Sequence, residues 1–154
     1  MTDTETSFFD AGARVLPDVA DTEKLGREMA TSLRAGDLVI LDGPLGAGKT
    51  AMARGIAAGL EVVGRVSSPT FIIARVHRPG RPDRPGMVHV DAYRLGGLDE
   101  LDALDLDSDL TDSVVVVEWG EGVAERLVDR HLMVRLRRDP ESEVRRAEWE
   151  WVNH

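Results

Sequence analysis

A glycine-rich segment at positions 43–50 combines the groups that bind a chain of phosphates. Its residues match the pattern G-x-x-x-x-G-K-[ST] in full: Gly43, Pro44, Leu45, Gly46, Ala47, Gly48, Lys49 and Thr50. Gly46 and Gly48 allow backbone dihedrals that are closed to other residues, so the loop N–H groups can point at phosphate oxygens. A helix that begins at this loop would add its positive N-terminal end. The segment, followed by Ala51, therefore predicts a polyphosphate-binding loop, or P-loop.

Lys49 and Thr50 have separate roles in such a loop. The Lys49 ammonium group can reach the β- and γ-phosphates of a nucleotide, and the Thr50 hydroxyl can bind Mg²⁺, which prefers oxygen ligands. A glycine turn that only connected a strand to a helix would not need these two residues at their fixed offsets. We therefore expect a nucleotide and Mg²⁺ as cofactors. The loop reads only phosphates, so the choice of ATP or ADP over a guanine nucleotide rests on the family resemblance and the missing guanine-binding segment described below.

Two acidic residues follow apolar runs that read as strands. Asp91 comes after positions 87–90, and Glu118 comes after the valines at 114–117. Ligands of a parallel sheet bind beyond the carboxyl ends of its strands, so either carboxylate could hold Mg²⁺ or orient the attacking water. A solvated acid at a strand end is the alternative for both. Lys49, Asp91 and Glu118 are thus the catalytic candidates, and Thr50, Asp91 and Glu118 are the metal candidates.

Three further features accompany these groups. His89 would share a strand face with Asp91, but a lone strand histidine is more often packed or hydrogen-bonded than catalytic. His89 is therefore a candidate for a supporting role behind the site. The S-S-P-T turn at 67–70, which ends in Thr70, could present a hydroxyl that senses the γ-phosphate, or it could be an ordinary turn. Trp119 could line the nucleotide pocket or belong to the core.

A sheet covered by helices is needed to bring these groups together. The apolar run 38–41 predicts a strand buried in a parallel sheet, and 50–60 is compatible with a helix behind it. Leu25, Met29 and Leu33 form one face of an earlier helix, which Asp21 or Thr22 would cap and which would end at Gly36. Further strands are expected at 71–76, 87–90 and 114–117.

The C-terminal part alternates apolar and polar residues over 132–136 and again over 144–152. These two stretches are expected to pair as an antiparallel hairpin. Trp149 and Trp151 would share one face of its last strand and are expected to be structural. Short helices or a capped loop are expected at 98–110, and a helix at 123–128. The fold predicted for residues 1–154 is one α/β domain, a P-loop NTPase whose mainly parallel central sheet is flanked by helices.

The composition restricts the classes of function. The 154 residues contain 28 acidic and 19 basic side chains, for a net charge of −9, which disfavours strong direct binding of tRNA. The absence of cysteine excludes disulfides and thiolate metal sites. Without a membrane span or signal peptide, a cytoplasmic protein is expected. A local basic cluster, which we read as an exposed connection, comprises Arg75, His77, Arg78, Arg81 and Arg84.

Four strings taken together resemble the TsaE (YjeE) family. They are G-P-L-G-A-G-K-T at 43–50, S-P-T-F at 68–71, H-V-D-A-Y-R-L at 89–95 and V-E-W-G-E at 117–121. The resemblance implies an ATPase that serves the synthesis of N6-threonylcarbamoyladenosine at adenosine 37 of tRNAs that read ANN codons. It also implies docking on a TsaD–TsaB assembly, without transfer of the threonylcarbamoyl group by the ATPase itself.

The resemblance also assigns roles to individual residues. It places Thr70 in a switch-like turn, Asp91 and Glu118 beside Mg²⁺, and Trp119 near the nucleotide. Ala51 departs from the pattern, because many members have a second threonine there, but Thr50 is retained and metal binding should survive. The Arg- and Pro-rich segment 75–85 also departs from the pattern, because it is longer than usual, and no partner contact is assigned to it.

Other classes of function remain open from the residues alone. A small-molecule kinase would use the same loop, but little chain remains after Glu118 for a lid and an acceptor pocket. A nucleotide-gated binding module without useful turnover is a non-enzymatic alternative. A GTPase is disfavoured because the chain has no Asn-Lys-x-Asp segment and Asp91 is not followed by x-x-Gly.

Overall fold

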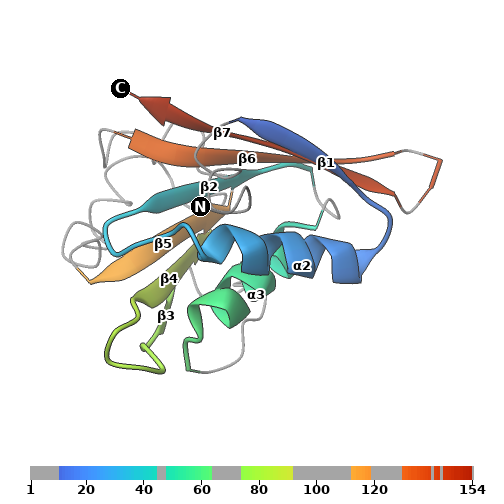
Figure 1. The fold of residues 1–154 in the computed structure, drawn as a ribbon. Helices are drawn as coiled ribbons and strands as arrows, with labels where there is room; N and C mark the ends of the chain where they lie inside the picture. Colours follow the sequence, from blue (N-terminus) through green and yellow to red (C-terminus); the bar gives the residue numbers. More distant parts are fainter. Residues whose placement is uncertain are drawn as a thin grey trace, which may run out of the picture.

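The structure is a computed structural model that describes residues 11–44, 48–63, 74–91, 112–118, 130–139, 141–142 and 144–153. Its centre is a seven-stranded sheet in the order β1-β7-β6-β2-β5-β4-β3 (Figure 1). The strands are β1 (Gly12–Leu16), β2 (Leu38–Asp42), β3 (Ala74–His77), β4 (Gly86–Asp91), β5 (Ser113–Glu118), β6 (Arg130–Arg138) and β7 (Arg145–Asn153).

The middle of the sheet is parallel and its flanks are antiparallel. Strands β6, β2, β5 and β4 run in one direction, whereas β7 and β3 run against their neighbours β6 and β4, and β1 runs against β7. The predicted C-terminal hairpin is confirmed, and it joins the main sheet through the pairing of β6 with β2. The fold is therefore a mixed α/β sheet, and the prediction of a mainly parallel sheet is correct only for its centre.

Two described helices lie together on one face of the sheet (Figure 1). They are α2 (Val19–Ala30) and α3 (Lys49–Leu60), and they pack closely against each other. A Cβ atom added at Gly55 would overlap the backbone carbonyl of Glu23, so glycine allows this approach. Side chains from both helices share the main core with the alternate sheet positions Val39, Val114 and Val116.

The first helix and strand differ from the prediction. The N-cap of α2 is Asp18, whose side chain accepts a hydrogen bond from the Asp21 N–H while the Asp21 side chain accepts one from the Asp18 N–H. This capping box gives Asp21 the role of third helical residue, and the α-helix ends at Ala30, before Gly36. Strand β1 was not predicted; its residues alternate in burial along the sheet edge until Leu16 enters the core.

The basic cluster is only partly an exposed connection. His77 belongs to β3 and is buried, whereas Arg78 and Arg81 are exposed in the turn that follows. The Arg84 guanidinium is half-buried because it donates to the carbonyl of Gly59 at the end of α3. Antiparallel pairing of β3 with β4 therefore takes the beginning of the cluster into the sheet.

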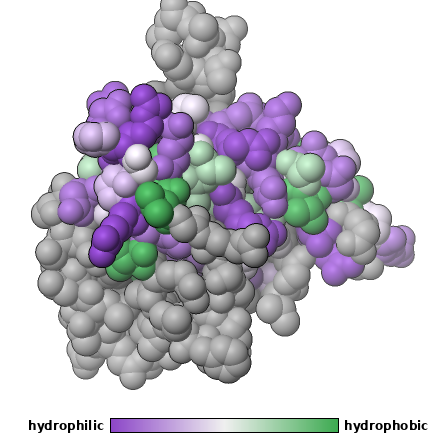
Figure 2. All heavy atoms as spheres, turned by 90° about the horizontal axis from the view of Figure 1, so that it is seen from below, coloured by the Kyte–Doolittle hydropathy of each residue, from purple (hydrophilic) through white to green (hydrophobic). Residues whose placement is uncertain are grey.

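The described residues that are visible from below the molecule are largely hydrophilic. Figure 2 shows small, separate hydrophobic areas among polar residues in the coloured part of this face. Trp149 is buried in the core and Trp151 packs against it, as expected for structural tryptophans. Of the helices that the structure describes, none has the length and apolar character needed to cross a membrane. The segments 98–110 and 123–128 lie outside the described residues.

Candidate functional site

The glycine-rich loop connects the end of β2 to the start of α3. Strand β2 ends at Asp42 and the helix begins at Lys49, which is the strand–loop–helix context that the motif requires. Gly48 is the N-cap and has a φ angle of 106°, a value that disfavours any residue with a Cβ atom. Leu45, Gly46 and Ala47 lie outside the described residues. Within the described part of the loop, the glycine at position 48 is therefore required by its backbone conformation.

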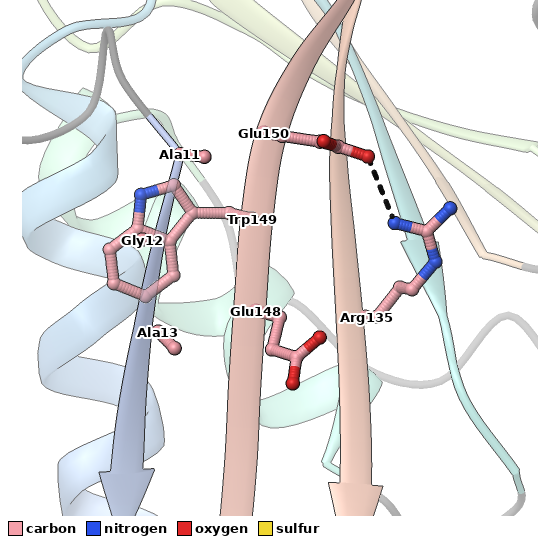
Figure 3. A pocket seen from close by; sticks show the side chains of 7 residues that line it. All are labelled: Ala11, Gly12, Ala13, Arg135, Glu148, Trp149 and Glu150. Atoms are coloured by element: carbon pink, nitrogen blue, oxygen red, sulfur yellow. Dashed lines mark hydrogen bonds and ion pairs between the residues drawn. The ribbon is translucent and has the colours of Figure 1, made fainter.

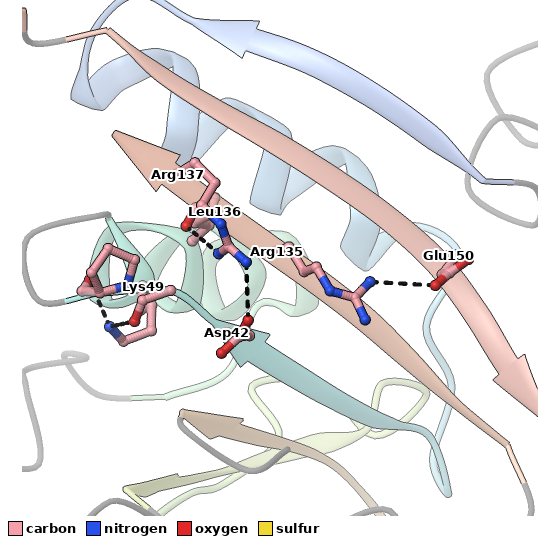
Figure 4. Close-up of polar contacts among 8 residues, drawn as sticks. Asp42, Lys49, Arg135, Leu136, Arg137 and Glu150 are labelled. Atoms are coloured by element: carbon pink, nitrogen blue, oxygen red, sulfur yellow. Dashed lines mark hydrogen bonds and ion pairs between the residues drawn. The ribbon is translucent and has the colours of Figure 1, made fainter. Parts of the chain in front are cut away.

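The Lys49 ammonium group lies over the loop that precedes it. Its Nζ atom donates to the carbonyl oxygens of Gly43 at 2.6 Å and Pro44 at 3.0 Å (Figure 4). Only 5% of the residue is exposed, and a buried cation of this kind needs such oxygen partners. The contacts place a positive charge beside the first turn of α3.

The first turn of α3 presents backbone N–H groups and the positive end of the helix dipole. Gly48 makes no side-chain cap, and no acidic residue lies in this turn. The first N–H groups of a helix have no partner within it, and here they belong to the segment of Lys49, Thr50 and Ala51. The helix end can therefore attract an anion. Thr50 follows Lys49 directly, so its hydroxyl belongs to the same turn.

The two acidic candidates lie side by side at the carboxyl edge of the sheet. In the strand register, Glu118 pairs with Leu41 on one side and with Asp91 on the other. Glu118 shares its strand face with Val114 and Val116, which pack into the core beneath the helices. The Asp91 side chain is outside the described residues, but its backbone is at the predicted place. Sheet pairing thus brings Asp91 and Glu118 to the edge from which the loop departs.

His89 contacts Glu118 directly. Its Nε2 atom lies 2.5 Å from the Oε2 atom of Glu118, and both residues are buried, with 0% and 6% exposure. The His89 Nδ1 atom is also buried and has no hydrogen-bond partner within the described part of the chain. The expectation that His89 is hydrogen-bonded is confirmed, and its partner is a catalytic candidate.

A charged pair beside the loop was not predicted. The Arg137 guanidinium on β6 contacts the carboxylate of Asp42 at 3.4 Å, immediately before Gly43 (Figure 4). The sequence carries no signal for this pair, because its members are 95 positions apart and meet only through the parallel pairing of β6 with β2. Arg137 also donates to the carbonyl of Leu136, so two acceptors hold the guanidinium at this corner.

A shallow hollow lies elsewhere on the molecule, over β1, β7 and β6. Figure 3 shows it beside the Arg135–Glu150 pair and the Trp149 ring that covers Gly12. Its volume is about 430 Å³, and its lining residues are Ala11, Gly12, Ala13, Arg135, Glu148, Trp149 and Glu150. None of the predicted site residues lines this hollow.

The described residues do not form a metal site made by protein ligands alone. No group of three or more His, Asp or Glu side chains among them could hold an ion. Mg²⁺ commonly uses only one or two protein ligands and takes the others from phosphates and water. Thr50 and an edge carboxylate therefore fit Mg²⁺ in the presence of a nucleotide. The other predicted contacts, Thr70 and Trp119, lie outside the described residues.

Comparison with known proteins relates these elements to a family. The family model described as "Threonylcarbamoyl adenosine biosynthesis protein TsaE" matches residues 16–147. The TsaE protein of Mycobacterium tuberculosis is 58% identical over 146 residues, which cover 91% of this chain and 87% of the relative. The TsaE protein of Streptomyces coelicolor is 60% identical over 126 residues, which cover 79% and 84%.

A solved structure is similar in fold. The crystal structure of Bacillus subtilis YdiB superposes with a TM-score of 0.71 at 26% identity, covering 94% of this chain and 86% of YdiB. The range matched by the family model contains the glycine-rich loop, β4 and β5. The candidate site therefore lies inside the region shared with these proteins.

Proposed function

Because the chain belongs to the TsaE family of threonylcarbamoyl adenosine biosynthesis proteins, we propose that it is a P-loop ATPase that supports this tRNA modification. The observation that carries the proposal is the junction of β2 and α3, where a complete phosphate-binding motif leads into a helix whose first turn contains no acidic residue. Strands β5 and β4, which follow β2 in the sheet, end in Glu118 and Asp91 at the same edge.

Each residue of the proposed site has a defined task. The backbone from Gly43 to Ala51 cradles the phosphates, and the Lys49 ammonium group neutralises the β- and γ-phosphates. Thr50 supplies a hydroxyl ligand to Mg²⁺. Asp91 and Glu118 supply carboxylate oxygens to the ion or to the attacking water.

The proposed role in tRNA modification also specifies protein partners and a cellular location for the chain. In the proposal, the chain acts in the cytoplasm on a TsaD–TsaB assembly and supports its turnover through ATP hydrolysis. It does not transfer the threonylcarbamoyl group itself. The acidic net charge of −9 fits contact with proteins better than strong contact with the tRNA backbone.

Calorimetry with Mg·ATP and Mg·ADP tests the proposed site. The unaltered chain should bind both nucleotides, and Lys49→Ala should remove nucleotide binding or hydrolysis because the phosphates lose their ammonium partner. Arg135→Ala is a matched control, since Arg135 is also a cation of the sheet but its guanidinium pairs with Glu150 on β7. A folded protein without any heat of association would contradict the proposal.

The cellular role has a separate test. Cells that lack the protein should lose N6-threonylcarbamoyladenosine from their tRNA, as measured by nucleoside analysis. ATP hydrolysis should rise when TsaD and TsaB are added, which distinguishes an accessory ATPase from a binding module without turnover. Retention of the modified nucleoside would reject the role in tRNA modification while leaving the nucleotide site intact.

A further inference from the structure

The contact between His89 and Glu118 is buried at the carboxyl end of β5. His89 is 0% exposed, and its ring spans from β4 to the end of β5, where Nε2 meets the Glu118 carboxylate at 2.5 Å. The Nδ1 atom has no partner among the described residues.

The direction of the hydrogen bond follows from the chemistry of the two groups. An ionised carboxylate can only accept, so the proton lies on Nε2 and His89 is the donor. With its proton on Nε2, the ring presents only a lone pair at Nδ1.

We propose that His89 is a positioning residue that fixes the Glu118 carboxylate through the Nε2–H···Oε2 hydrogen bond, so that the other carboxylate oxygen serves the nucleotide site. This inference rests on the proposed ATPase function. The bond restricts rotation of Glu118, whose oxygens would otherwise exchange places at the strand end. A fixed acceptor beside the loop favours a single orientation of the metal or of the attacking water.

Two substitutions at one position separate positioning from packing. His89→Leu removes the donor and fills the site, whereas His89→Gln supplies an amide N–H that can replace Nε2–H. The turnover number for ATP should fall about 10- to 100-fold in His89→Leu, the usual effect of losing such a supporting hydrogen bond. His89→Gln should recover most of this loss. Calorimetric affinity for Mg·ADP should change little in either variant, because the loop and Lys49 still bind the phosphates.

His131 provides the matched control. It is also a buried histidine of the sheet, with 1% exposure, but it lies at the start of β6, away from the carboxyl edge. His131→Leu should leave the turnover number unchanged. Thermal unfolding of all variants then shows whether a change in activity follows a general loss of stability.

Nuclear magnetic resonance supplies a readout that does not depend on turnover. Two-bond proton–nitrogen spectra of ¹⁵N-histidine-labelled protein should show the His89 ring protonated at Nε2 and bare at Nδ1, with its signals assigned by their loss in His89→Gln. The opposite tautomer, unchanged turnover in His89→Leu, or equal losses in the Leu and Gln variants would overturn the inference. An unaltered chain that fails to hydrolyse ATP would instead reject the proposed function, and the tautomer would still be measured.

Discussion

The charge and the shape of the Glu118 side chain can be tested separately by substitution with glutamine. The residue is buried at the end of β5, where its Oε2 atom contacts the Nε2 atom of His89. A glutamine there keeps an oxygen acceptor of the same reach but removes the negative charge. The effect of this substitution therefore reports on the charge rather than on packing.

Glu118→Gln should preserve nucleotide binding and abolish most hydrolysis. If the carboxylate orients the attacking water and accepts its proton, the turnover number should fall by about two to four orders of magnitude. Affinity for Mg·ADP and release of phosphate from ATP are the measurements. Glu150→Gln on the opposite sheet face is the control, because Glu150 pairs only with Arg135 among the contacts described. Normal hydrolysis by Glu118→Gln would remove Glu118 from the catalytic assignment.

Asp37 is an acid whose environment alters its protonation. Burial raises the pKa of Asp37 above its ordinary value of 3.8, and the Arg34 N–H donor and the charges of Arg130 and Arg34 oppose this shift only in part. The folded chain therefore holds this proton at a higher pH than the unfolded chain does. As the pH rises from 3.8 through the folded-state pKa, the stability associated with the protonated form is lost.

Asp37→Asn should make stability less dependent on pH over this window. The amide oxygen can still accept from the Arg34 N–H, a bond of 2.7 Å in the unaltered chain, but nothing ionises. The melting temperature of Asp37→Asn relative to the unaltered chain should therefore increase from acidic to neutral pH. Asp139→Asn, an exposed acid in the β6–β7 turn, is the control. A difference in melting temperature that stays constant with pH would contradict the raised pKa.

At the scale of elements, the contact between α2 and α3 depends on glycines that face the partner helix. Gly26 and Gly55 each lie where a Cβ atom would meet backbone atoms of the other helix. Intrinsic propensity alone favours alanine over glycine inside a helix by about 1 kcal/mol. Glycine is therefore required at these positions only if the clash of an added Cβ atom costs more than this gain in helix propensity.

Gly55→Ala should lower the free energy of unfolding by about 1–3 kcal/mol, the usual cost of inserting an atom into a packed interface. The added methyl group would meet the carbonyl of Glu23 and push α2 away from α3. Chemical denaturation measures the change. Ala58→Gly on the exposed side of α3 is the control, and it should show only the propensity effect of about 1 kcal/mol. Stabilisation by Gly55→Ala would show that the helices approach less closely.

The elements that sequence reasoning placed correctly carry strong local patterns. A few consecutive residues are enough to predict the valine strand β5 and the glycine-rich loop before Lys49. Parallel pairing of β4 with β5 then places Glu118 beside Asp91. Strand β1 has no such pattern, because an edge strand alternates weakly and gains its stability from pairing with β7. The contacts of His89 with Glu118 and of Arg137 with Asp42 depend on register between distant strands. Local periodicity does not determine that register.

On the scale of the whole molecule, the distribution of charge disfavours binding of nucleic acid more than binding of proteins. Acidic side chains outnumber basic ones by 28 to 19. Many described arginines already face carboxylates: Arg14 with Glu28, Arg54 with Glu23, Arg81 with Glu61 and Asp83, Arg135 with Glu150, and Arg137 with Asp42. A polyphosphate backbone would have to displace these carboxylates to reach the guanidinium groups.

The isolated protein should therefore show no strong binding to tRNA at physiological salt, as measured by fluorescence anisotropy of labelled tRNA. Repeating the measurement at lower salt concentrations detects weak electrostatic binding. Each neutralised phosphate contributes about one unit to the slope of log affinity against log salt concentration. Arg137→Glu should leave the result unchanged if no phosphate reaches the corner beside Asp42. Tight binding with a steep salt dependence, weakened by Arg137→Glu, would instead identify this corner as an RNA contact and would contradict an accessory role exerted only through proteins.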